Sequence, residues 1–309
     1  MTEVNQFVFF DFEMLCSKEG MPYADMESIR LGAVKYDLET KSITSFDRFI
    51  KPLQTEPLSE FCKSLTHIED CDLAFADGFP VVLKEFFTWV GIVETSRFFS
   101  WSTNDISRLE LDASRHDIPQ TTIAMVKNRY VDFQETFSKR VSKTNPSVET
   151  ALALYDLNFY GEKHNPMYDA YNTLRVYLAF SEELVKSDLI MLKQFIFHDQ
   201  DITLKCDINL QLKAYLKNDL QNLFKQITII SNIRSARKLL KRTSKLVKKY
   251  ENVLINRSQL FNEEIILYVR MLIEFYHDLL VSYNKHYSYG CKIMILHEHM
   301  TSPLQRLTA

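Results

Sequence analysis

The chain has 309 residues, of which 46% are hydrophobic and 25% are charged, so it can bury one large core or two smaller ones, and a disordered or low-complexity chain is excluded. No apolar run reaches the roughly 18 residues that span a bilayer, and no basic segment precedes the first apolar run, so we expect neither a membrane partner nor a signal peptide. The five cysteines are widely spaced without a CxxC pair. They predict free thiols in a reducing compartment and therefore a cytoplasmic protein.

The formal net charge of −3 is divided unequally along the chain. Residues 1–185 contain 18 Lys and Arg against 29 Asp and Glu, a net charge of −11, whereas residues 186–309 contain 19 against 11, a net charge of +8. This division predicts two domains with different partners, with a boundary near residue 185.

The first strand pattern covers residues 6–13, which are apolar on both faces, as is typical of a central strand in a covered sheet. Residues 28–38 and 45–52 follow with strand patterns around a turn at 37–40, so the three segments form a predicted meander.

Helix patterns then alternate with one short strand pattern. The helices are predicted at 58–68, 79–90, 106–113 and 148–157, and the strand at 96–101. Asn165 is a good N-cap and Pro166 fits the first position of one more helix. The first region is therefore predicted to be an α/β domain with a mixed sheet.

From about residue 186 the strand signals fade. Apolar side chains repeat at helical spacing within residues 212–227, 239–254 and 261–280. They predict three long amphipathic helices packed as a bundle, and so an all-α accessory domain over 186–309. Such a bundle could also bind a protein partner or a second copy of the chain.

Two carboxylates, Asp11 and Glu13, stand two residues apart on the first strand and therefore share one face of it. Two buried carboxylates repel each other and lose their hydration, and a hard divalent cation removes both problems. The alternative is that the strand ends at Phe10 and that both acids lie in a solvated loop.

Three further residues could complete such a site. Asp105 follows a short strand, at the kind of strand end where α/β sheets bind ligands, although an acid in a first helical turn is also favoured by the helix dipole. Asp169 lies one turn into the helix capped by Asn165, where a plain surface acid is the alternative. His164 precedes that cap and is a candidate general base, while a lone His is more often structural.

The acids and the histidine occur in a fixed order: D-x-E, then Asp after a strand, then H-x4-D before a helix. This order resembles that of the DEDDh 3′→5′ exonucleases of the ribonuclease H-like superfamily. The matching residues are Asp11, Glu13, Asp105, His164 and Asp169. The segments LSEFCKSLTHI, FADGFPVVLKEFFTWV, SWSTND and ALALYDLNFYGEKH also resemble the branch that holds the histone-mRNA 3′-end exonucleases and the bacterial KapD-like proteins. This resemblance covers roughly residues 6–180 and implies a mixed five-stranded sheet flanked by helices.

The resemblance also implies two Mg2+ or Mn2+ ions and an in-line displacement. Asp11 would bridge the ions, Glu13 and Asp169 would complete the shell of one, and Asp105 would hold the other. His164 would deprotonate the attacking water. The substrate would be a nucleic acid with a free 3′ end, RNA slightly preferred over DNA, and the product a nucleoside 5′-monophosphate.

The terminal base of such a substrate needs a platform. The matched segments offer Phe12, Leu65 and Thr66, through aromatic or apolar contact and a backbone hydrogen bond. Phe12 and Leu65 are equally compatible with a place in the core. His67 stands where the branch usually has Gly, in the segment that resembles the wall of this nucleotide site.

A basic segment, RSARKLLKRTSKLVKK, runs from Arg234 to Lys249 without an acid. Helical spacing places its cations on one stripe, which fits a polyanion. The predicted substrate contacts on it are Arg234, Lys238, Lys241, Arg242, Lys245 and Lys248. A solvated helix face, or a face paired with an acidic subunit, is the alternative.

The leading hypothesis is a metal-dependent 3′→5′ exonuclease with a helical accessory domain. The rival hypotheses are a non-catalytic nucleic-acid-binding protein and an oligomerising scaffold on the same fold.

Overall fold

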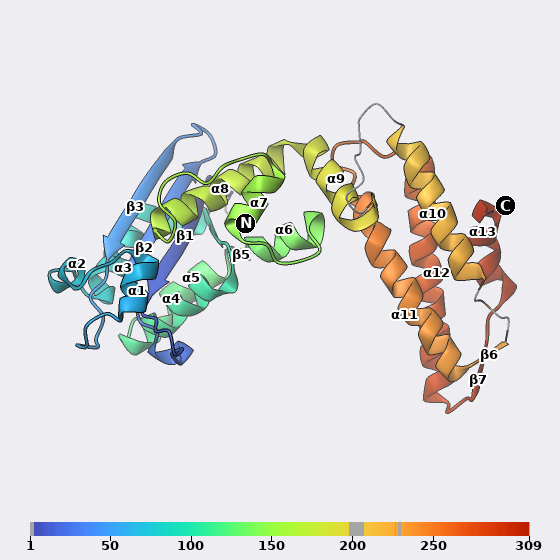
Figure 1. Ribbon diagram of the computed structural model, residues 1–309, viewed down its shortest axis with the longest axis horizontal. Helices are drawn as coiled ribbons and strands as arrows, with labels where there is room; N and C mark the ends of the chain where they lie inside the picture. The colour runs from blue at the N-terminus through green and yellow to red at the C-terminus, as the bar shows by residue number, and fades with distance from the viewer. Residues whose placement is uncertain (1–2, 198–206, 226, 228–229, 309) are drawn as a thin grey trace. The chain divides into compact units, whose positions relative to one another are not determined.

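A computed structural model describes residues 3–197, 207–225, 227 and 230–308 of the chain (Figure 1). The chain divides into two compact units. The first unit contains residues 1–139 and 144–182, and the second contains residues 140–143 and 183–309.

The first unit is built on a five-stranded sheet with the order β3-β2-β1-β4-β5. The strands are β1 (Gln6–Met14), β2 (Ser28–Asp37), β3 (Ile43–Phe49), β4 (Ser96–Ser100) and β5 (Tyr130–Asp132). β1 pairs antiparallel with β2 and parallel with β4, and β2 pairs antiparallel with β3. The predicted mixed sheet and its three-stranded meander are therefore confirmed.

Helices cover both faces of this sheet. They are α1 (Glu60–Thr66), α2 (Asp70–Ala74), α3 (Phe79–Val90), α4 (Thr103–Arg115), α5 (Gln120–Lys127), α6 (Phe133–Val141), α7 (Val148–Leu154) and α8 (Pro166–Glu182), with short 3-10 turns at Tyr23–Asp25 and Val93–Thr95. Val8, Phe10 and Phe12 of β1 belong to one core with buried side chains of α3 and α4.

The opposite face of β1 is packed against α8. Phe7 and Phe9 both contact Tyr177 of α8, with ring centroids 5.3 and 5.5 Å apart. β1 is thus apolar on both faces, as its sequence predicts, because helices cover both. The side chains of Asp11 and Glu13 continue the row that Phe7 and Phe9 begin, on the face packed by α8.

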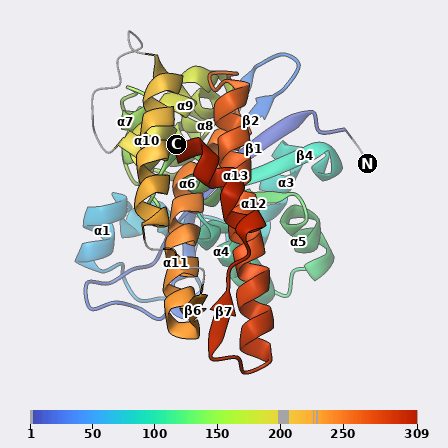
Figure 2. The same ribbon diagram turned by 90° about the vertical axis from the view of Figure 1, so that its right-hand side faces the viewer.

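The second unit is mainly helical. Its helices are α9 (Leu184–Leu192), a π-helical turn (Lys193–Phe197), α10 (Ile208–Phe224), α11 (Ile233–Tyr250), a 3-10 turn (Glu251–Ile255), α12 (Glu263–Ser288) and α13 (Glu298–Thr308). α10, α11 and α12 run side by side (Figure 2) and are the three predicted long helices. Their buried side chains, such as Leu216, Val247 and Leu272, form the core of this unit.

The prediction that this region is entirely α-helical is wrong in one respect. Residues Ile230–Asn232 (β6) and Ile293–Ile295 (β7) form a small antiparallel sheet. Strands of three residues are too short to produce a detectable alternation, and their pairing joins segments about 60 residues apart.

Among the described residues, no helix combines the length and the apolar character that a membrane span requires. Cys16, Cys62, Cys71 and Cys291 are free thiols, whereas Cys206 lies outside the described residues.

Candidate active site

Asp11 and Glu13 both lie within β1, because this strand continues to Met14. The alternative that the strand ends at Phe10 and leaves the acids in a loop is therefore wrong. In the antiparallel register, Asp11 lies opposite Gly32 and Glu13 lies opposite Arg30 of β2. Both carboxylates project from the central strand of the sheet and are half-buried there, so they lose part of their hydration.

Asp169 comes from the first turn of α8, which begins as the sequence predicts. The Met167 N–H donates to Oδ1 of Asn165 over 3.2 Å, and the Asp169 N–H donates to the Asn165 carbonyl over 2.9 Å. Pro166 takes the first helical position. This cap fixes the point where the helix starts and thus the height of Asp169 above the sheet.

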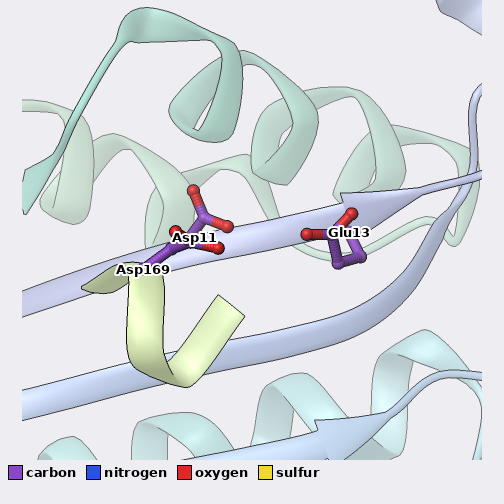
Figure 3. A group of neighbouring side chains, drawn as sticks. All are labelled: Asp11, Glu13 and Asp169. Carbon is purple, nitrogen blue, oxygen red and sulfur yellow. The ribbon is translucent and has the colours of Figure 1, made fainter. Parts of the chain in front are cut away.

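These three acids form one cluster, drawn in Figure 3. Asp11, Glu13 and Asp169 each offer a carboxylate oxygen, and these oxygens all lie within 4.8 Å of one another. The acids come from two elements more than 150 residues apart in the chain. Acids from separate elements that converge at this distance form a donor set of the kind that hard divalent cations prefer.

Asp105 lies beside the trio, in the first turn of α4, and is 5% exposed. Its Oδ1 accepts a hydrogen bond from the Phe12 N–H over 3.2 Å. Asp105 is thus tied to β1 between Asp11 and Glu13. The 4.8 Å cluster does not include it, so the structure brings together three of the four predicted ligands and places the fourth next to them.

The pKa values of all four carboxyl groups are raised. Burial is the main cause for each, and repulsion between the acids adds to it for Asp11, whose pKa lies well above its usual range. The pKa of Glu13 is raised to about 8, although the cation of Arg30 opposes this shift. The pKa values of Asp105 and Asp169 are raised to about 7. Without a cation, the site therefore holds protons near neutral pH.

His164 lies in the loop before α8, and its side chain is exposed. Its backbone has a left-handed φ of 59°, and its backbone N–H hydrogen bonds to the Asp169 carboxylate. Non-glycine residues adopt this conformation only when their surroundings impose it. The loop thus joins His164 to the acid cluster through its backbone, and the role of its ring as a base stays a prediction.

The loop that carries His164 is fastened to α8 by a buried amide. Asn172 accepts a hydrogen bond from the Tyr160 N–H over 3.1 Å and donates to the carbonyls of Tyr160 and Tyr168. Gly161, with a φ of 82°, packs so closely on Tyr168 that a Cβ would lie 2.3 Å from its ring. The sequence does not reveal this support, because an Asn inside a helix pattern carries no such signal.

The candidate base platform lies partly in α1. Ser59 and Cys62 bind α1 to the end of β1 through the carbonyls of Cys16 and Met14, over 2.7 and 3.8 Å. This contact places Leu65, which is half-buried, and Thr66, which is buried, on a helix next to the last residues of β1.

Phe12 is 4% exposed within the core, which agrees with the alternative interpretation of this residue. Base contact by Phe12, Leu65 or Thr66 stays a prediction. His67 caps α1 with a left-handed φ of 57°, a conformation that glycine adopts without strain, which explains why a Gly suits this position.

Gly32 and Arg30 also determine the geometry and charge of the acid cluster, and the sequence analysis did not identify them. Gly32 faces α8 so closely that a Cβ would lie 2.0 Å from the Met167 nitrogen, so only glycine allows α8 to start above Asp11. Arg30 binds Asp47 through two hydrogen bonds of 2.8 and 2.7 Å and supplies a positive charge beside Glu13. A lone Gly within a strand pattern is the signal that could have indicated the first of these.

The six predicted basic contacts all lie on α11, in the second unit. Arg234, Lys238, Lys241, Arg242, Lys245 and Lys248 are all exposed.

The family model described as Exonuclease (RNase_T) matches residues 8–177. Human ERI1 exoribonuclease 2 is 25% identical over 188 residues, which cover 54% of this chain and 27% of that protein. Human 3′-5′ exoribonuclease 1 is 23% identical over 177 residues, which cover 54% of this chain and 49% of that protein. The chain thus spans half or less of the length of these two relatives.

A solved nuclease domain of 3′hExo, a DEDDh family member bound to rAMP, superimposes with a TM-score of 0.53 and 20% identity, over 58% of this chain and 93% of that chain. This likeness confirms the predicted ribonuclease H-like fold. Because the family model covers more than half of the chain, the protein belongs to this RNase T-type exonuclease family. The predicted resemblance is therefore confirmed, and membership implies divalent metal ions.

Proposed function

We propose that this protein is a 3′→5′ exonuclease that releases nucleoside 5′-monophosphates from the free 3′ end of single-stranded RNA or DNA. The observation that carries the proposal is the convergence of Asp11, Glu13 and Asp169 within 4.8 Å. RNA is the preferred substrate, because both human relatives are named exoribonucleases.

The residues present fit a pair of Mg2+ or Mn2+ ions. The donors are all carboxylates, and burial, followed by repulsion from neighbouring acids, raises their pKa values. A bound cation would offset both effects. Asp11, Glu13 and Asp169 would hold the ions together with Asp105. When bound, such ions stabilise the charge on the attacking and leaving oxygens of a phosphodiester.

The remaining chemistry belongs to the chain itself. His164 takes the proton of the attacking water, from an exposed loop that Asn172 and Asp169 hold in place. The buried hydrogen bond from the Phe12 N–H keeps Asp105 fixed against β1. Leu65 and Thr66 line the approach of the terminal nucleotide at the end of β1.

The test is digestion of end-labelled single- and double-stranded RNA and DNA by the full chain, with Mg2+, with Mn2+ or with a chelator. We expect stepwise shortening from the 3′ end, nucleoside 5′-monophosphates as products, and no digestion with chelator. A His164→Ala variant should lose roughly 100-fold or more in rate. Exposed His277 serves as the matched position, and His277→Ala should retain the full rate.

Binding of oligonucleotides without any metal-dependent hydrolysis would contradict the proposal and favour a non-catalytic binding protein. Products with 3′-phosphates, or internal cleavage of circular substrates, would contradict the stated reaction.

A further inference from the structure

The helix α11 of the second unit carries seven exposed cations, which we call the α11 stripe: Arg234, Arg237, Lys238, Lys241, Arg242, Lys245 and Lys248. At 100° per residue they lie within about 140° of the helix circumference, and they extend over about 21 Å along its axis. Ala236, Leu239, Thr243, Val247 and Tyr250 occupy the opposite, buried face.

None of these seven side chains forms an ion pair or a hydrogen bond with a described residue of the chain. The contrast with the next residue is informative. Lys249 donates to Asp219 of α10 over 2.6 Å, and the Tyr250 hydroxyl donates to the same carboxylate over 2.7 Å. Asp219 is thus already neutralised where it lies beside Arg242 and Lys245, and the positive charge of the stripe stays uncompensated.

The stripe is unfavourable for the helix that carries it. Arg234, Arg237, Lys238, Lys241, Arg242 and Lys245 include four like-charged pairs at i, i+4, and each such pair destabilises a helix. Arg234 and Arg237 also lie near the N-terminus of α11, where the helix dipole is positive. A bound polyanion would remove both penalties.

The chemistry of the stripe favours nucleic acid over two other anionic partners. The apolar face of α11 is buried in its own unit, so the helix has no apolar side to insert into a membrane. Between residues 232 and 250, no large hydrophobic side chain is exposed, and a protein interface needs an apolar centre with few lysines. A line of solvated Arg and Lys suits the phosphates of a nucleic-acid backbone.

We propose that the α11 stripe is a second nucleic-acid-binding surface, which holds the phosphate backbone independently of sequence. The identity of the polyanion rests on the proposed function, because an exonuclease with a first unit of strongly negative charge needs a cationic surface to retain its substrate. Among its described residues, α11 itself carries no exposed aromatic side chain, so this helix has no platform on which a base could stack.

The experiment measures binding without hydrolysis. Full-length protein carrying Asp11→Asn is titrated against a fluorescein-labelled oligouridylate of about 30 nucleotides, longer than a single binding site, by fluorescence anisotropy at several salt concentrations. The test variant adds Lys238→Gln, Lys241→Gln and Lys245→Gln. The matched control adds Lys41→Gln, Lys84→Gln and Arg97→Gln, three exposed cations of the first unit with the same change in net charge.

Each phosphate contact to a single strand contributes about 0.7 to the slope of the logarithm of the binding constant against the logarithm of the salt concentration. Three lost contacts should therefore reduce that slope by about 2 and weaken binding about 100-fold at 0.1 M salt. The control should keep the parental affinity and slope. Equal affinity and slope for the test variant and its parent would overturn the proposal. Stripe-dependent binding of poly-glutamate or of phosphatidylserine vesicles that matches the oligouridylate in affinity would overturn the choice of nucleic acid.

A second readout separates this proposal from the proposed function. A dinucleotide contains one phosphodiester, so its hydrolysis tests the proposed reaction without a long strand. With Asp11 restored, the protein without stripe substitutions should hydrolyse the dinucleotide, whereas the affinity for the long strand is measured separately in the Asp11→Asn background. Failure of every variant to hydrolyse the dinucleotide would contradict the proposed function and leave the binding result standing.

Discussion

The two units of this protein each hold a group of like charges, of opposite sign in the two units, and the spacing of the charges differs between the groups. In the first unit, Asp11, Glu13 and Asp169 crowd their oxygens within 4.8 Å of one another inside a covered sheet. In the second unit, the seven cations of the α11 stripe are spread along a solvated helix face. Both groups are unfavourable without a ligand.

The difference indicates two kinds of counterion. Half-buried carboxylates at short distances need concentrated positive charge, which a divalent cation provides. Solvated cations distributed over about 21 Å need charge distributed over the same length, which a nucleic-acid backbone provides. The first arrangement binds a metal and positions a reaction, whereas the second provides affinity without sequence preference.

The largest expected effect concerns the acid cluster. Asp11→Asn removes a charge from the centre of the trio, and we expect it to abolish the metal-dependent exonuclease activity, with a loss of more than about 100-fold, while the fold remains intact. Hydrolysis rates and circular dichroism measure the two effects. Glu19→Gln, an exposed acid after β1, is the control and should retain activity. An Asp11→Asn protein with an undiminished rate would disprove the assignment of the site.

The next effect concerns the placement of α8. Gly32→Ala introduces a Cβ 2.0 Å from the Met167 nitrogen, so the start of α8 must move away from β1. We expect destabilisation by about 1–3 kcal/mol and a loss of activity of about 100-fold, because Asp169 moves with its helix. Gly78→Ala is the control, since the nearest atom there lies 3.8 Å away. Normal activity with normal Mg2+ dependence in Gly32→Ala would contradict this role.

A third prediction concerns the pH dependence of the metal-free protein. In the folded state, the pKa of Glu13 is near 8 and the pKa values of Asp105 and Asp169 are near 7. The ordinary values are 4.5 for Glu and 3.8 for Asp. The folded state therefore binds more protons than the unfolded state between about pH 4 and 8. The free energy of unfolding should therefore fall as pH rises through this window.

Added Mg2+ should restore this stability, and its effect should grow with pH, because it competes with protons for the same oxygens. Thermal denaturation with Mg2+ or with chelator across this pH range measures both effects, with NaCl at equal ionic strength as the control. Asp11→Asn should flatten the pH dependence. Stability of the metal-free protein that rises towards pH 8 would contradict the prediction.

The smallest effect concerns the α11 stripe. Lys241 has like charges four residues away on both sides, Arg237 and Lys245, so Lys241→Gln should stabilise the protein by about 0.4–1 kcal/mol in the absence of nucleic acid. Lys249→Gln should instead destabilise it, because Lys249 pairs with Asp219 over 2.6 Å. Chemical denaturation at low salt measures both changes. A loss of stability in both variants would show that the stripe is part of the packing of its unit.

The sequence alone determined four strands of the main sheet, the helices with a clear apolar pattern and the identity of the candidate ligands. The helices α2, α5, α6, α9 and α13 were not predicted. Period-2 and helical patterns are local, so the strands of the meander and the long helices are predictable, as is the Asn165 cap. The order of the acids is also local information. The three short strands β5, β6 and β7 were also missed, because three residues carry no period.

Tertiary structure decided what these residues do together. It brought Asp169 to Asp11 by letting α8 start against Gly32, tied Asp105 to the Phe12 backbone and buried the Phe12 ring in the core. It also showed that Lys249 is paired while its seven basic neighbours on α11 are not paired with any described residue. The reason is physical: a sequence specifies which side chains are available, whereas distance and hydration, which set the interaction between charges, exist only once the chain has folded.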